Sequence, residues 1–337
     1  MERRRVACLT MMRDETFFFP IWYRHYASIF GHENLYVIDH LSQLWPQAPD
    51  ADRPLNVLHI PVEFDRGQRH GRNRLDGRRF RLISTMVEAL LAVYDTVIFN
   101  DTDEIFITDP DRYRDVGAFL DAHGDRHPAF GGIGLEVVHD PVAEPPFDPA
   151  LPALGQRSTF VYSLHYAKPH IVSQPCRIGA HGISQPWALS RDLYLVHLKN
   201  VDADHLAERQ ARLNRYFERG SGGPGSEWRW TTEQKMKALR ALLDRPAEPE
   251  PLRHHSELAE FFFEAGAGRI GGPKGPRRRD GTPVIEGRMI KLSAHVGQRK
   301  KRMLQTRRQH LPGRFAKAGG AAASVDCRSR RLAPRRA

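Results

Sequence analysis

The fold is decided by ten consecutive residues, Val97-Ile98-Phe99-Asn100-Asp101-Thr102-Asp103-Glu104-Ile105-Phe106. The apolar run at its start predicts a buried strand, and the acids that follow place carboxylates at the C-terminal end of that strand. Ligands of open α/β sheets bind at the carboxyl ends of the strands. Three acids between two apolar segments also need partners, because unpaired buried charges are costly. This stretch therefore predicts a ligand site at the end of a sheet strand.

The acidic tetrad Asp101-Thr102-Asp103-Glu104 has the spacing of a metal site. Carboxylates at positions i and i+2 of a strand-to-turn junction can share one divalent cation. Mn²⁺ or Mg²⁺ prefers such oxygen ligands together with the oxygens of a diphosphate, and a cation there would neutralise charge on a diphosphate leaving group. The alternative is a polar turn, which favours the same residue types, but Glu104 and the apolar flanks favour the metal.

The N-terminal region predicts a β-α-β unit. Residues 6–12 have the pattern of a buried strand, 17–30 carry apolar residues at helical spacing, and 34–38 form a second apolar run. Such an order favours a mainly parallel sheet with helices on its faces. The fold class that we expect is therefore α/β.

The rest of the chain alternates in the same way. Strands are expected at 55–60, 96–99, 129–139, 159–162, 169–172 and 193–198, a polar loop at 64–74, and helices at 78–93, 112–122, 203–218, 232–243 and 257–263.

Positive charge is concentrated at the C-terminal end. From Arg269 onward there are 20 basic and 3 acidic residues, a net charge of +17. Because the whole chain carries +11, residues 1–268 carry −6. The segment from 266 is rich in Gly, Pro, Arg and Lys and poor in large apolar residues, so we expect it to be mostly disordered.

Cysteine usage and hydropathy indicate a cytoplasmic chain. Cys8, Cys176 and Cys327 form no C-x-x-C pair, which supports neither a disulfide framework nor a zinc ribbon. The sequence contains no apolar run near the roughly 18 to 20 residues of a membrane span, and Met1–Arg5 does not begin a signal peptide. Contact with a membrane is expected only at its inner face, as a peripheral protein.

Four segments resemble the glycosyltransferase family 2-like group of bacterial proteins, which have a GT-A fold. They are Met12-Arg13-Asp14-Glu15, the aromatic stretch 18–26, Tyr36-Val37-Ile38-Asp39 and the D-x-D-E motif within 98–106. The resemblance covers roughly residues 5 to 205. It implies a Rossmann-like mixed sheet, a nucleotide-sugar donor and a catalytic domain at 1–205. A helical extension at 206–265 and the basic tail at 266–337 would follow.

The resemblance also assigns roles near the first strands. Asp101 and Asp103 match the metal and diphosphate positions, and Glu104 matches a residue that binds the metal or orients the loop. Asp39 matches the acid that contacts the nucleoside, while Arg13 and Glu15 lie where the first strand meets the base and ribose. Soon after that acid the family often has Ser-x-Asp. This chain has His40-Leu41-Ser42-Gln43-Leu44 instead, which leaves the nucleoside unidentified.

Three downstream residues also match the family. Lys168 and His181, in its later "K-P … G-x-H" region, are expected to contact the donor, and His197 is expected to complete the metal site. The chain holds 17 histidines, so surface or purely hydrogen-bonded roles are the alternative for His181 and His197.

An inverting transferase needs a general base that deprotonates the acceptor hydroxyl. Glu136 and Asp140 follow the metal motif on the next strand, and the glycines before them would let the backbone approach a sugar closely. A strand with an exposed glutamate is the alternative. Residues 66–81 contain seven arginines, which either contact phosphates or form a solvated surface.

The expected activity is metal-assisted hexosyl transfer from a nucleotide sugar to a glycan, a lipid-linked or another hydroxyl acceptor, as in cell-surface polysaccharide biosynthesis. One alternative is a phosphatase in which Asp101 attacks phosphorus and Asp103 acts as acid and base, although such loops normally follow the first strand. Another is a non-enzymatic protein whose basic tail binds an anionic membrane or a polyanion. The sequence has no motif for specific nucleic-acid recognition.

Overall fold

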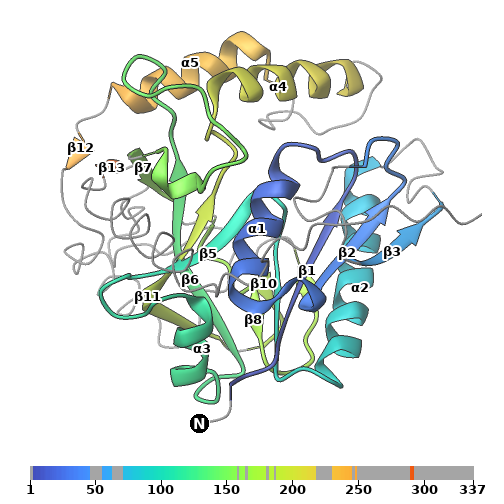
Figure 1. Ribbon diagram of the computed structural model, residues 1–337. Coiled ribbons are helices and arrows are strands. Elements are labelled where there is room, and N and C mark those ends of the chain that lie inside the picture. Colours follow the sequence, from blue (N-terminus) through green and yellow to red (C-terminus); the bar gives the residue numbers. More distant parts are fainter. Residues whose placement is uncertain are drawn as a thin grey trace, which may run out of the picture.

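The computed structural model describes residues 3–45, 55–62, 71–157, 159–163, 166–179, 182–185, 187–217, 230–244, 247–248 and 289–291. They form a mixed α/β fold in which helices flank a central, largely parallel sheet (Figure 1).

Four parallel strands form one half of the sheet. β1 (Val6–Met12) lies between β2 (Leu35–His40) and β4 (Thr96–Phe99), and β3 (Asn56–Ile60) pairs with the outer side of β2. Strand order thus runs from β1 outward through β2 and β3, then returns to the other side of β1. The carboxyl ends of β1 and β4 therefore flank a topological switch point, where open α/β sheets bind ligands.

The second half of the sheet is mixed. β8 (Ile171–Val172) joins β4 to β6 (Ala129–Val137) by antiparallel pairing on both sides. β11 (Ala188–His197) pairs in parallel with β6 and antiparallel with β5 (Glu104–Thr108). The remaining strands are β7 (Thr159–Tyr162), β12 (Ala247–Glu248) and β13 (Met289–Lys291) in the same sheet, with β9 (Ile178–Gly179) and β10 (Gly182–Ile183) as a separate pair.

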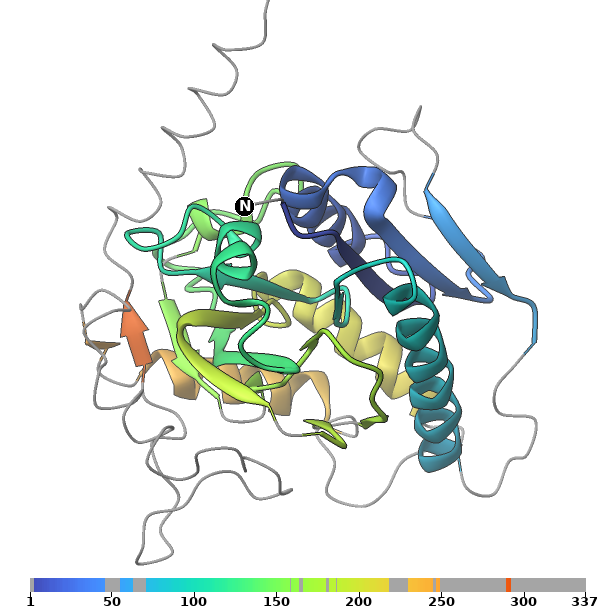
Figure 2. The ribbon, with the colours of Figure 1, turned by 90° about the horizontal axis from the view of Figure 1, so that it is seen from below.

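Helices cover both faces of the sheet. Side chains of α1 (Phe18–Phe30) and α3 (Val116–His123) belong to the larger apolar cluster, and those of α2 (Gly71–Leu91) belong to the cluster on the opposite face. Figure 2 shows α2 on one side of the strands and α1 and α3 on the other. α4 (Ala203–Phe217) and α5 (Thr232–Leu243) lie together at the end of the sheet in Figure 1 and pack through Leu206 and Leu239.

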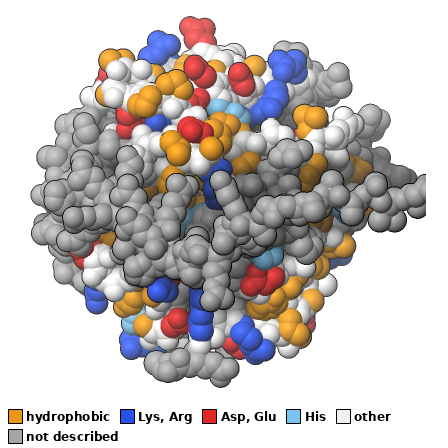
Figure 3. All heavy atoms as spheres, in the orientation of Figure 1, with side chains coloured by type: hydrophobic (Ala, Val, Ile, Leu, Met, Phe, Trp, Pro, Cys, Tyr) orange, Lys and Arg blue, Asp and Glu red, His pale blue; other side chains and the backbone are white. Residues whose placement is uncertain are grey.

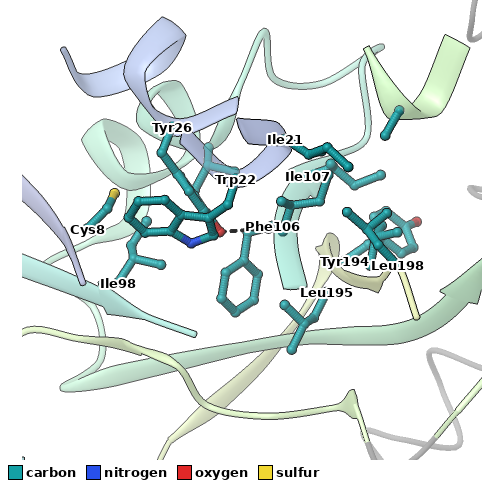
Figure 4. Packing of buried hydrophobic residues seen from close by; sticks show 14 of the residues in the cluster. Cys8, Ile21, Trp22, Tyr26, Ile98, Phe106, Ile107, Tyr194, Leu195 and Leu198 are labelled. Atoms are coloured by element: carbon teal, nitrogen blue, oxygen red, sulfur yellow. Dashed lines mark hydrogen bonds between the residues drawn. The ribbon is translucent and has the colours of Figure 1, made fainter. Parts of the chain in front are cut away.

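A buried polar contact set ties α1 to the tetrad. The Asn100 side chain accepts a hydrogen bond from Trp22 Nε1 at 2.9 Å and donates to Tyr26 OH at 2.7 Å and to the Glu104 carbonyl at 2.8 Å. Tyr26 OH also accepts from the Phe106 amide at 2.9 Å, the interaction drawn in Figure 4. The turn that carries the acids is therefore fixed from the core side.

Several predicted boundaries were wrong. Residues 71–74, expected in a polar loop, already belong to α2, and β11 begins at residue 188 instead of 193. α3 begins at Val116 because the Asp115 side chain accepts a hydrogen bond from the Ala118 amide and caps the helix. The helix predicted at 257–263 lies outside the described residues, as does the tail apart from 289–291.

Within the described residues, no helix is both long enough and apolar enough to cross a bilayer.

Candidate active site

The acidic tetrad follows β4 at the carboxyl edge of the parallel strands, and its last member, Glu104, is the first residue of β5. The Glu104 amide donates to the Asp101 carbonyl at 3.0 Å, which closes the turn, and the Leu198 amide donates to the Asp103 carbonyl at 2.7 Å. The second contact attaches the turn to the residue after β11. Asp103 and His197 are thereby brought together, and their predicted role as metal ligands stays a prediction.

The Asp103 carboxylate is buried between β11 and α4. Its Oδ2 atom lies 3.5 Å from His197 Nε2 and 3.2 Å from Arg209 Nη1. Burial alone would raise the pKa of Asp103, but the interactions of its carboxylate with His197, Arg209 and Lys168 outweigh burial and hold that pKa well below its usual range. The carboxylate is therefore ionised at neutral pH. The His197 ring stacks on Tyr166, with 3.9 Å between ring centroids, which fixes its orientation.

Glu104 has a different set of partners. Lys168 Nζ donates to its Oε1 at 2.6 Å, and His170 Nδ1 lies 3.4 Å from its Oε2. Burial favours the neutral acid, yet Lys168 and His170 lower the pKa of Glu104 far below the ordinary value. Burial lowers the pKa of Lys168, but the negative charges of Glu104, Asp101 and Asp103 outweigh burial and raise that pKa. Its main contact is the Glu104 carboxylate, and its predicted contact with a donor stays a prediction.

Asp101 is the accessible acid. Its side chain is 40% exposed and forms an ion pair with Arg79 of α2. Asp101 and Asp103 thus both lie at the sheet edge, but in this structure each faces an arginine.

Asp39 lies at the end of β2, at the same edge. Its Oδ1 accepts a hydrogen bond from the Ser42 amide at 3.1 Å, and its Oδ2 lies 2.9 Å from His59 Nδ1. Trp45 lies next to that histidine, with 5.8 Å between ring centroids. The predicted contact of Asp39 with a nucleoside stays a prediction.

The segment after β1 has a structural role. The Asp14 carboxylate accepts hydrogen bonds from the Gln43 and Leu44 amides and so holds the loop that departs from the family pattern. Glu15 accepts from the Phe17 and Phe18 amides at 3.3 and 3.1 Å, which places its charge at the N-terminus of α1. Burial raises the pKa of Glu15. Arg13 is 44% exposed, 4.0 Å from Asp14. Donor contacts of Arg13 and Glu15 stay predictions.

The two candidate bases differ. Glu136 Oε1 accepts from Asn200 Nδ2 at 2.6 Å and lies 3.4 Å from Lys199 Nζ. Glu136 is also in register with His197 across β6 and β11. Asp140, in contrast, accepts hydrogen bonds from the amides of the next turn, Val142 at 3.0 Å and Ala143 at 3.3 Å. We therefore carry the general-base hypothesis forward for Glu136.

Neighbouring backbone of the protein lies against the glycines of β6. Their predicted role, to let the backbone approach a sugar closely, is therefore corrected. A Cβ at Gly134 would lie 2.0 Å from the Ser163 carbonyl oxygen, and one at Gly132 would lie 2.8 Å from the Leu195 amide nitrogen. Close packing of neighbouring backbones accounts for both glycines.

Two cationic residues of the site were not singled out from the sequence. Arg209 lies on α4, in the predicted extension, and its spacing of three from the buried Leu206 would have placed it on the inward face of the helix. Arg79 lay among the seven arginines of 66–81, with no local signal to distinguish it. His181 lies outside the described residues.

The residues fit a divalent cation in part. Asp103 and His197 are 3.5 Å apart, close to the spacing of about 3 Å expected of two ligands that each bind a metal at about 2.1 Å. Within the described ranges no group of three or more His, Cys, Asp or Glu side chains is positioned to hold a metal ion. Asp101, the other predicted ligand, is paired with Arg79.

Comparisons with known proteins give no family. No protein-family model matches the chain, and no curated protein matches it. Among solved structures, mannose-1-phosphate geranyltransferase from Thermus thermophilus is similar at 13% sequence identity, with 86% of this chain and 74% of that chain covered and a TM-score of 0.25. A similarity at this level does not assign an activity.

Proposed function

We propose that this chain is a glycosyltransferase that moves a sugar, of the hexosyl type, from a nucleotide-diphosphate donor to a hydroxyl acceptor on a glycan or lipid-linked molecule. The observation that carries the proposal is the position of the tetrad. An accessible carboxylate, Asp101, and a buried ionised one, Asp103, lie together at the carboxyl edge, beside the switch point between β1 and β4.

Asp103 and His197, joined by Asp101, would hold Mn²⁺ or Mg²⁺ against the donor diphosphate. Bound there, the cation would neutralise the negative charge that develops on the leaving nucleoside diphosphate. Asp39 at the end of β2 would orient the nucleoside. Glu104 and Lys168 neutralise each other within the protein.

Glu136 would deprotonate the acceptor. Residues in register on adjacent strands point to the same face, so Glu136 of β6 and His197 of β11 face the same way. Attack by the acceptor oxygen, once Glu136 has taken its proton, would invert the configuration at the sugar by direct displacement.

A phosphatase is the second candidate, because Asp101 is accessible enough to act as a nucleophile. It would need Asp103 as an acid, yet Arg209 and His197 stabilise the ionised form of that carboxylate. Incubation with Mg²⁺ and a generic phosphomonoester decides between the two. Turnover that Asp101→Asn abolishes would favour the phosphatase.

The main test is calorimetric binding of nucleoside diphosphates in the presence of Mn²⁺. The full-length chain is expected to bind at least one of them, and Asp101→Asn is expected to weaken that binding at least tenfold. Asp125→Asn is the matched control, since Asp125 is also paired with an arginine, Arg4, but is 90% exposed and belongs to the turn after α3. Absence of binding by the unaltered protein across the whole panel would refute the proposal.

A further inference from the structure

Each acid of the tetrad has its own basic partner from a different part of the chain. Arg79 of α2 pairs with Asp101, Arg209 of α4 with Asp103, and Lys168 with Glu104. The three carboxylates are thus neutralised one to one within the protein.

The three pairs differ in accessibility. The side chains of Glu104 and Lys168 are only 1% and 11% exposed, so this pair is internal. The side chains of Arg79 and Arg209 are 25% and 24% exposed, so these two pairs are partly accessible to solvent. Each of these guanidinium groups also lies 5.5 Å from the centre of a phenylalanine ring, Phe80 or Phe18, which can support it after the carboxylate is released.

The two arginines occupy the carboxylates that a divalent cation would need. Asp103 Oδ2 is shared between His197 and Arg209, and Asp101 is turned toward Arg79. A cation that bound alone would displace two positive groups and leave them beside a further double charge. A diphosphate bound at the same time would supply acceptors for them, because guanidinium groups bind phosphate oxygens in bidentate fashion.

We propose that Arg79 and Arg209 are internal counter-cations of Asp101 and Asp103, and that the two arginines move from these carboxylates to the diphosphate of the donor when cation and donor bind together. The inference rests on the proposed function and extends it to two further binding residues, one of them on α4. It follows that the cation and the nucleoside diphosphate strengthen each other's binding. The factor by which the cation raises the affinity for the nucleoside diphosphate equals the factor by which the nucleoside diphosphate raises the affinity for the cation.

The test measures two affinities by calorimetry on the full-length protein: Mn²⁺ alone, and a nucleoside diphosphate at saturating Mn²⁺. Arg79→Gln and Arg209→Gln are each expected to raise the affinity for Mn²⁺ alone by about tenfold, because a group that competes for the carboxylate is removed. Each should also lower the affinity for the nucleoside diphosphate by about tenfold, because a partner of the phosphate oxygens is lost. The exposed Arg81 and Arg212, on the same two helices, provide the matched controls Arg81→Gln and Arg212→Gln, which should change neither affinity.

Opposite changes in the two affinities identify the exchange, since a purely structural defect would weaken both. Arg209→Lys keeps the charge but not the planar guanidinium group. Its affinity for Mn²⁺ alone should stay as weak as that of the unaltered protein, and its affinity for the nucleoside diphosphate should lie between those of Arg209→Gln and the unaltered protein. Unchanged or jointly weakened affinities in folded Arg79→Gln and Arg209→Gln proteins would overturn the inference while leaving the proposed function in place. If the unaltered protein binds no nucleoside diphosphate, the proposed function itself fails.

Discussion

At the scale of single residues, the three acids of the tetrad differ in how far each is removed from water. The Asp101 side chain is 40% exposed, that of Asp103 is 9% exposed and that of Glu104 is 1% exposed. An exposed ion pair contributes little to stability, whereas removal of one partner of a buried pair leaves an uncompensated charge.

We therefore expect that replacing each acid by its neutral amide lowers the free energy of unfolding more, the more deeply the acid is buried. Asp101→Asn should lower the free energy of unfolding by less than about 1 kcal/mol. Glu104→Gln should lower it by about 3 kcal/mol or more, with Asp103→Asn between them. Chemical denaturation at neutral pH measures the three values. An Asp101→Asn protein as unstable as Glu104→Gln would show that the burial order does not control stability here.

His205 of α4 provides a pH-dependent contribution to stability. Its ring stacks on Phe17 with 3.7 Å between centroids. Burial, aided by the charges of Arg209 and Arg212, lowers the pKa of His205 from 6.5 to about 4. The unfolded chain then binds the proton more readily than the folded protein as the pH falls from 6.5 to 4, so stability is lost in that window.

His205→Phe keeps the stacked ring and removes the titration. The loss of unfolding free energy between about pH 7 and pH 4 should be smaller in this variant by roughly 1 to 2 kcal/mol, a value reduced because part of the ring remains solvent-accessible. Denaturation curves across this range provide the measurement. The exposed His127 serves as control through His127→Gln, which should keep the slope of the unaltered protein. An unchanged slope in His205→Phe would contradict the assignment.

The acids of the site could be predicted from the sequence, but their partners could not. Asp101, Asp103 and Glu104 follow a buried strand within a few residues, so local pattern was sufficient. Their cationic partners are 22, 106 and 64 residues away in the chain. Only the packing of α2, α4 and the segment before β8 brings them together, and a single sequence carries no direct signal of such contacts.

At the scale of elements, β6 depends on close backbone packing. A Cβ at Gly134 would meet the Ser163 carbonyl oxygen at 2.0 Å, a contact that requires the backbone to move. Gly77, in α2, would meet nothing within 4 Å.

Alanine at these two glycines should therefore have opposite effects. Gly134→Ala is expected to destabilise the fold by about 3 kcal/mol because the added methyl overpacks the strand. Gly77→Ala should stabilise it by about 0.5 to 1 kcal/mol, because glycine is a poor residue in a helix interior. Thermal unfolding of both variants measures the effects. A Gly134→Ala protein with unchanged stability would mean that β6 tolerates a wider spacing.

Elements with an uninterrupted pattern could be predicted closely. β1, β4 and α5 have the bounds expected from apolar periodicity. β11 was predicted too short because the polar residues before Leu193 break its pattern, and its pairing with β6 shifts register between Ser190 and Tyr194. α2 was predicted too short because its first turns are rich in arginine and lack an apolar face.

At the scale of the whole molecule, the α/β class followed from the order of strands and helices, and the structure confirms it. The predicted domain boundary at residue 205 falls inside α4, the helix that carries Arg209 to Asp103. Side-chain packing, not chain order, determines which segments build the site.

The net charge of the chain is unevenly distributed along its sequence. On the face shown in Figure 3, charged side chains of both signs are interspersed among the described residues. The sequence from Arg269 carries a net +17, against −6 for all that precedes it. A lipid-linked acceptor of the proposed reaction would lie in a membrane, and a polybasic segment gains about 1 kcal/mol per Lys or Arg near an anionic surface.

We accordingly expect the tail to bring the enzyme to anionic lipid. In vesicle sedimentation at low salt, the full-length chain should partition onto vesicles of mixed neutral and anionic lipid, and a chain lacking residues 292–337, which keeps β13 in the sheet, should stay in solution. Vesicles of neutral lipid alone are the control for both proteins, and rising salt should release the full-length chain because it screens the attraction. Equal partitioning of the two proteins on anionic vesicles would exclude the tail as the membrane-binding segment, whichever acceptor the site uses.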